Sequence, residues 1–148
     1  MIDDTRLSGI LREELGLSRD FLSLLREEET ALVAGDSERL TEIVRRKSEI
    51  IGRIAPLAEE RNRMVPNSAI VEWLKRHPDS MEVWKELIHL SGLIRASNET
   101  NGAIIDTRLR SNQQALSMLQ HLAGRTTSLY GPDGHSSVSS GRYDIDRA

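Results

Sequence analysis

The chain offers few residues whose type and spacing could support catalysis. No histidine lies three or four residues from another, so the paired-histidine zinc face of a helix is absent; the four are His77, His89, His121 and His135. No serine lies in the Gly-x-Ser-x-Gly sequence of a nucleophile elbow. The glycines at 131–134 flank a proline and favour a turn over a phosphate-binding loop. We therefore predict a protein with no enzymatic activity, no metal and no cofactor.

Charge and composition argue against two classes of partner. The basic triplet at 45–47 is neutralised by Glu42 and Glu49, and aromatic residues are only 3% of the chain, so no nucleic-acid surface is expected. No apolar run approaches the ~20 residues that span a bilayer, and the acidic start at 1–4 lacks the apolar region of a secretory signal. Cysteine is absent. We expect a soluble, cytoplasmic protein that does not insert into a membrane.

Asparagines interrupt an otherwise apolar helical stripe in the last third of the chain. Asn98, Asn101 and Asn112 lie at stripe positions, where each amide needs a hydrogen-bond partner if it is buried. They could specify the register of a helical bundle, or they could belong to a part-polar groove for a helix of another protein. The sequence alone leaves both interpretations open.

The elements that would position these residues are helices. Apolar residues recur at three- and four-residue steps, which predicts helices over about 4–34, 37–64, a short 69–76 and 81–123. Gly35 is a typical helix stop and Asp36 a typical start, so a tight turn joins the first two. Pro56 lies inside the second helix and is expected to kink or briefly break it without ending it, because the stripe resumes in phase at Leu57.

The predicted fold is all-α: an elongated antiparallel three-helix bundle or coiled coil with a long C-terminal helix and a flexible tail. Residues 1–123 form the helical domain. Residues 124–148 are rich in Gly and Ser and lack a stripe, which is typical of a flexible segment. Glu14 and Glu28 interrupt the apolar face of the first helix.

Three stretches resemble a known family, the FlgN family of flagellar type III export chaperones. Residues 98–105 are similar to its N-x-x-N-G-x-L-[LI] pattern, and residues 112–119 to its N-Q-Q-A-L-x-x-L pattern. Residues 129–134, with Ser137-Val138-Ser139 after them, resemble its L-Y-G-x-D-G tail. The three stretches lie in the family's order.

The resemblance implies a cytoplasmic helical chaperone that binds hook-associated proteins of the hook–filament junction. Such a chaperone prevents their premature assembly and delivers them to the membrane export gate. The cargo-binding residues implied are Ile105, Leu109, Asn112, Leu116 and Leu119, and Tyr130 matches a tyrosine linked to export-gate docking. Two alternatives remain: a structural coiled-coil protein that oligomerises through its last helix, and an enzyme built on a helical bundle.

Overall fold

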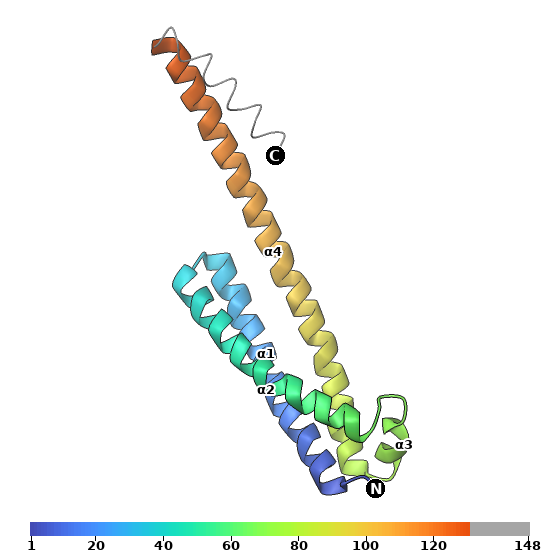
Figure 1. Cartoon of the computed structure of the whole chain (residues 1–148). Coiled ribbons are helices and arrows are strands. Elements are labelled where there is room, and N and C mark those ends of the chain that lie inside the picture. Colours follow the sequence, from blue (N-terminus) through green and yellow to red (C-terminus); the bar gives the residue numbers. More distant parts are fainter. Residues whose placement is uncertain (131–148) are drawn as a thin grey trace. The chain divides into compact units, whose positions relative to one another are not determined.

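Long helices build this protein. The computed structural model describes the backbone of residues 1–130 and the side chains of residues 1–124. Within these residues the elements are α1 (Asp4–Ala34), α2 (Ser37–Met64), α3 (Ile70–Lys75) and α4 (Pro78–Tyr130), in that order along the chain (Figure 1). The all-α fold predicted from the sequence is confirmed.

Two residues make the turn between α1 and α2. Gly35 adopts the left-handed conformation with φ of 70°, and the backbone N–H of Asp36 donates to the carbonyl of Ala31 at 3.0 Å. This closes α1 with a glycine C-cap. The Asp36 carboxylate then accepts a hydrogen bond from the backbone N–H of Arg39 at 3.1 Å and caps α2. The predicted tight turn is confirmed, and it returns α2 antiparallel to α1.

Two ion pairs join the facing sides of α1 and α2. The Nε of Arg61 donates to Glu14 at 2.9 Å, and the Nζ of Lys47 lies 3.1 Å from Glu28. The two glutamates are two heptads apart on α1, and so are their two partners on α2. Both glutamates are buried, so a shift of register would leave buried charges without partners. The interruptions of the apolar face therefore set the register of the helical hairpin.

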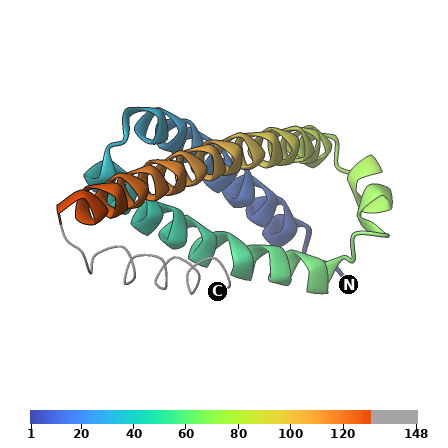
Figure 2. The same cartoon turned by 90° about the horizontal axis from the view of Figure 1, so that it is seen from above.

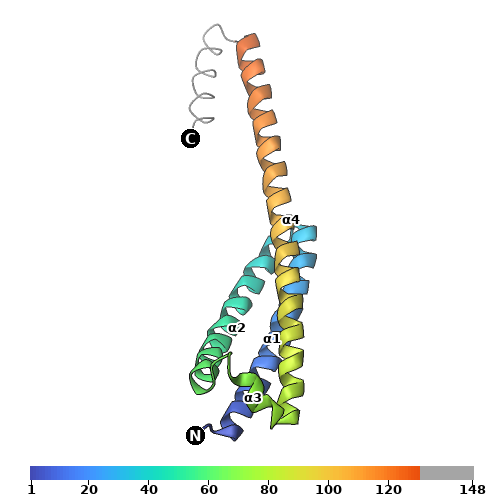
Figure 3. The same ribbon diagram turned by 90° about the vertical axis from the view of Figure 1, so that its right-hand side faces the viewer.

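The first part of α4 completes a bundle with this hairpin. Ser8 and Ser80 place their hydroxyl oxygens 3.0 Å apart, and farther along both helices Asn101 donates to the carbonyl of Leu25. The contacts advance in the same direction on both helices, so α4 runs parallel to α1, and Figure 3 shows them side by side here. An up-down-up bundle of three helices results. A buried apolar cluster in this bundle contains Leu7, Leu11, Leu15, Leu22, Val65, Ile70, Trp73, Leu74, Leu87 and Leu90.

The short helix α3 closes the end of the bundle near the N-terminus (Figure 2). Trp73 is buried, and its indole N–H donates to Asp4 at 2.8 Å. The ring of His77 stacks on Trp73 with centroids 4.0 Å apart, and its Nε2 lies 3.2 Å from the Asp4 carboxylate. The hydrogen bond from Trp73, helped by His77, lowers the pKa of Asp4 below its ordinary value. These contacts tie the start of α1 to the segment that precedes α4.

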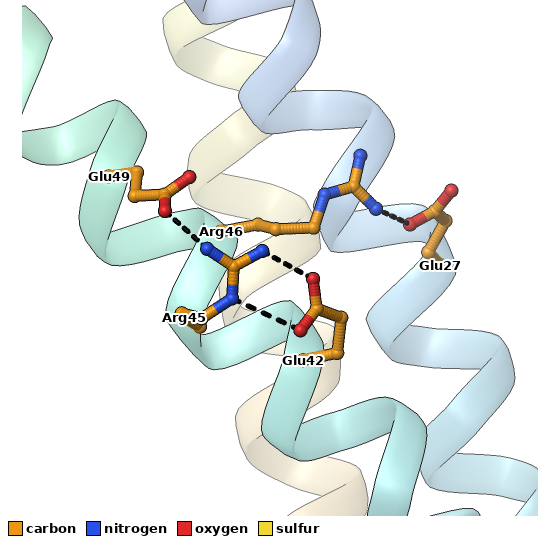
Figure 4. A network of polar contacts seen from close by, with 5 residues as sticks. All are labelled: Glu27, Glu42, Arg45, Arg46 and Glu49. Carbon is orange, nitrogen blue, oxygen red and sulfur yellow. Dashed lines mark hydrogen bonds and ion pairs between the residues drawn. The ribbon is translucent and has the colours of Figure 1, made fainter.

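A second polar network lies on the outer surface of α2. Arg45 forms a two-pronged contact with Glu42 and also pairs with Glu49, while Arg46 reaches Glu27 of α1 at 3.2 Å (Figure 4). The hydrogen bonds from Arg45 lower the pKa of Glu42. The basic triplet is therefore paired within the hairpin, as expected from its acidic neighbours.

Some predicted boundaries agree with the structure and others differ. The limits of α1 and α2 match, and α2 continues through Pro56 without a break. The last helix was predicted over 81–123, but α4 begins at Pro78 and ends at Tyr130. Proline is favoured in the first turn of a helix, and the first strong stop after position 123 is the Gly131-Pro132 pair. The rest of the predicted tail, 131–148, lies outside the described residues.

Contacts divide the chain into two compact units, Met1–Ile105 and Asp106–Ala148. The bundle described above is the first unit. The described part of the second unit consists of α4 from Asp106 onward.

Candidate protein-binding surface

Four of the five residues predicted to bind cargo lie on one side of the helix of the second unit. They are Leu109, Asn112, Leu116 and Leu119, spaced by three, four and three residues, so the helix aligns them along one face. Ile105 is the last residue of the first unit. All five side chains are exposed; they are Ile105, Leu109, Asn112, Leu116 and Leu119.

Exposure of these apolar side chains is large. Leu116 keeps 58% and Leu119 keeps 63% of its surface accessible. A single exposed leucine is ordinary on a protein surface, whereas a contiguous row of them indicates an interaction site. The face can bury apolar area against a partner helix, with Asn112 as a polar break in the middle.

The structure separates the three seam asparagines. Asn101 is buried at 2% exposure, and its side-chain N–H group donates to the Leu25 carbonyl at 3.0 Å and to Glu28 at 2.8 Å. Both neighbours are acceptors, which fixes the amide orientation and leaves Asn101 Oδ1 without a hydrogen-bond partner among the described residues. Asn98 and Asn112 are exposed. Asn101 therefore fits the interpretation that a seam asparagine specifies the register of the bundle. Asn112 fits the interpretation that it belongs to a part-polar surface for another protein.

Glu28 is the centre of a polar layer that joins all three helices of the bundle. It accepts hydrogen bonds from Lys47 of α2 and from Asn101 of α4. The same lysine lies 5.7 Å from the ring centroid of Phe21. Asn101 is thus part of the bundle's own core rather than of a surface for another protein.

The prediction from the sequence did not use the absence of charged residues from the second part of α4. Residues 111–124 contain no Asp, Glu, Lys or Arg, while the longest other stretches without these residues are eight residues long. From 111 to 123 every residue is exposed. Charged residues are depleted at the centres of protein interfaces. The absence of charge was visible in the sequence and could have widened the predicted site.

Two further apolar side chains in this stretch lie beside the predicted face. Met118 is 67% exposed and Leu122 is 49% exposed. Neither belongs to the five residues that the resemblance implies. They extend the exposed apolar surface around the helix.

Tyr130 is the last residue of α4. Its side chain lies outside the described part of the structure, and so do the residues that follow it. Its suggested docking role therefore stays a prediction.

The described residues form neither a metal-binding cluster nor a membrane-spanning helix. No group of three or more histidine or carboxylate side chains there could hold a metal ion. No helix within that part of the chain is long and apolar enough to cross a membrane.

A helical protein with a contiguous exposed apolar face belongs, by its physical character, to the proteins that bind other proteins. The sequence model of the family described as "FlgN protein" matches residues 1–137 of this chain. The chain belongs to the FlgN family, and the resemblance seen in its sequence is confirmed.

Relatives extend over nearly the same length as this chain. A protein of Yersinia enterocolitica, named flagella synthesis protein FlgN, is 30% identical over 137 residues, which cover 91% of this chain and 92% of the relative. Proteins of the same name from Salmonella typhimurium and Escherichia coli are each 28% identical, with 91% of this chain and 93% of the relative covered. No solved structure matches.

Proposed function

We propose that this protein is a cytoplasmic export chaperone for hook-associated proteins, the subunits of the hook–filament junction. It binds these subunits before export, prevents their premature assembly and delivers them to the type III export gate. The family and the names of the relatives support a role in flagellar synthesis. The observation that supports protein binding is the exposed apolar face of α4.

The energetics of this face suit a partner that must later be released. If about 600 Å² of apolar area is buried, the gross gain is about 15 kcal/mol at roughly 25 cal/mol/Å². Ordering a flexible partner segment on the helix consumes much of that gain. The polar break at Asn112 lowers it further. The result is moderate affinity, as a hand-over step requires.

Paired aspartates test the proposed site. Leu116→Asp with Leu119→Asp should abolish binding of a separately purified hook-associated protein of the same bacterium, because two charges then lie in the apolar face. The matched control is Gln114→Asp with Ser117→Asp, which adds the same charge at the same spacing on the opposite face. Isothermal titration calorimetry measures binding, and circular dichroism measures the thermal melt.

Both double variants should melt close to the unmodified protein, because the replaced side chains are exposed. A collapse of the melt in the leucine variant alone would show that these leucines belong to a core. Normal binding by that variant would remove the proposed site.

Tyr130 is proposed to act in delivery to the export gate and not in cargo capture. Aromatic side chains commonly fill a pocket on a partner. Tyr130→Ala should leave cargo affinity within roughly 0.5 kcal/mol, while secretion of junction subunits and motility fall. Tyr130→Phe retains the ring and should retain part of the secretion. A tenfold loss of cargo affinity, or normal secretion by Tyr130→Ala, would contradict a separate docking role.

A further inference from the structure

The apolar surface of the second part of α4 is wider than the predicted face. Successive residues of an α-helix are rotated by about 100°, so Ala115, Met118 and Leu122 lie to one side of the row formed by Leu116 and Leu119. Together these five side chains form an apolar arc over roughly half of the circumference of the helix. All five are exposed.

The width of this arc indicates how many helices it can accommodate. A single partner helix needs only the narrow seam of a coiled coil, whereas a helix packed against several neighbours carries a wider apolar arc. The first part of α4 is packed in the second way, against more than one neighbouring helix. There Asn101 contacts α1, and Trp84 lies 5.3 Å from the guanidinium of Arg61 on α2.

The charge of the surface limits the chemistry of the partner. Within 111–124 the polar side chains are hydroxyls, amides and one histidine, with no carboxylate, ammonium or guanidinium. A charged side chain of the partner buried on this arc would lose its hydration without gaining an ion pair. The partner's contact surface must therefore also be free of charge.

We propose that this arc binds two amphipathic helical segments of one partner protein, side by side, each with an uncharged contact face. This inference rests on the proposed function and adds Met118 and Leu122 to the binding residues. The first segment covers the row with Leu116 and Leu119, and the second covers the side with Ala115, Met118 and Leu122. A second copy of this chain, paired through the same helix, supplies one helix and covers only one of the two rows.

Met118→Glu tests the second row directly. Met118 is exposed, so the substitution leaves the fold intact, and it places a charge where only the second segment makes contact. We expect binding of the purified hook-associated protein to weaken about tenfold or more, as for truncation of a central interface residue. The control is Ser117→Glu, which adds the same charge on the opposite face and should change affinity less than about twofold.

The results separate this inference from the proposed function. If Met118→Glu binds normally while Leu116→Asp with Leu119→Asp does not bind, a single helix occupies the site and the inference fails alone. If neither variant affects binding, the proposed function fails as well. Light scattering on the protein without partner supplies a further outcome. A dimer that Met118→Glu converts to a monomer, with partner affinity unchanged, would assign the arc to self-association and overturn the inference.

The salt dependence of binding tests the uncharged contact. Raising NaCl from about 0.05 to about 0.5 M strongly screens interactions between charges. The dissociation constant should change less than about threefold, because no ion pair forms on the arc. A weakening of about tenfold or more would show that charged groups hold the partner and would overturn the inference.

Discussion

Asn101 and Asn112 lie eleven residues apart in the sequence of α4 and have opposite surroundings. Asn101 is buried and bonded to Leu25 and Glu28 of α1, whereas Asn112 is exposed. The residue type and the helix are the same. What differs is whether the described part of the chain supplies a neighbouring helix.

The same contrast holds for the apolar residues of α4. Leu87 and Leu90 are buried in the bundle, while Leu116 and Leu119 are exposed. An apolar row on a helix shows that something packs there, but not whether that partner belongs to the same chain. Substitutions in the first row should therefore affect folding, and substitutions in the second row should affect binding.

The largest expected effect separates the core from the exposed row. Trp73→Ala should lower the free energy of unfolding by about 3–5 kcal/mol, because it removes a fully buried aromatic side chain. Leu119→Ala should change it by less than about 0.5 kcal/mol. Urea unfolding monitored by circular dichroism measures both values. Equal losses in the two variants would contradict the distinction between the core and the exposed row.

The two asparagines provide a comparison of intermediate size. Asn101→Leu should lower the free energy of unfolding by about 1–3 kcal/mol, because buried Glu28 then loses one of its donors. Asn112→Leu should leave stability nearly unchanged. It should strengthen cargo binding modestly if Asn112 lies in the contact, since it fills the polar break. A stabilising effect of Asn101→Leu would show that the polar layer serves specificity of register at a cost in stability.

The smallest expected effect concerns pH and the end of the bundle near α3. The pKa of Asp4 is lowered below its ordinary value of 3.8, chiefly by the hydrogen bond from Trp73. A lowered pKa means that this carboxylate stabilises the fold above its ordinary pKa. That contribution is lost as the pH falls through the folded-state value.

Asp4→Asn removes this titration and provides the measurement. Between about pH 5 and pH 2.5 the melting temperature should fall less steeply in Asp4→Asn than in the unmodified protein. Melts recorded by circular dichroism across this range compare the two slopes. Parallel curves would show that Asp4 contributes nothing to the acid sensitivity.

The helices and their turn could be predicted because their determinants are local. Gly35 and Asp36 are adjacent, and the apolar spacing needs only a short window of sequence. The polar pairs within the bundle were not predicted, because each joins residues far apart in the chain. One signal was present: Glu14 and Glu28 have the same two-heptad separation as Lys47 and Arg61 on the next helix.

The candidate surface was predictable only in part. Its residues came from the family resemblance, and the structure shows that all five are exposed. That Asn101 would be buried and Asn112 exposed depends on which helix lies beside each, which no local pattern encodes. The charge-free stretch at 111–124 could have been counted directly, and it would have pointed to Met118.

The two-residue turn at Gly35 and Asp36 has a consequence for the order of folding. The contacts between α1 and α2 that lie nearest this turn join residues close in sequence, and such contacts form fast because little loop entropy is lost. The α1–α2 hairpin can therefore assemble on the ribosome before α4 has been synthesised. Asn101 then joins a hairpin whose register the Glu14–Arg61 and Glu28–Lys47 pairs have already set.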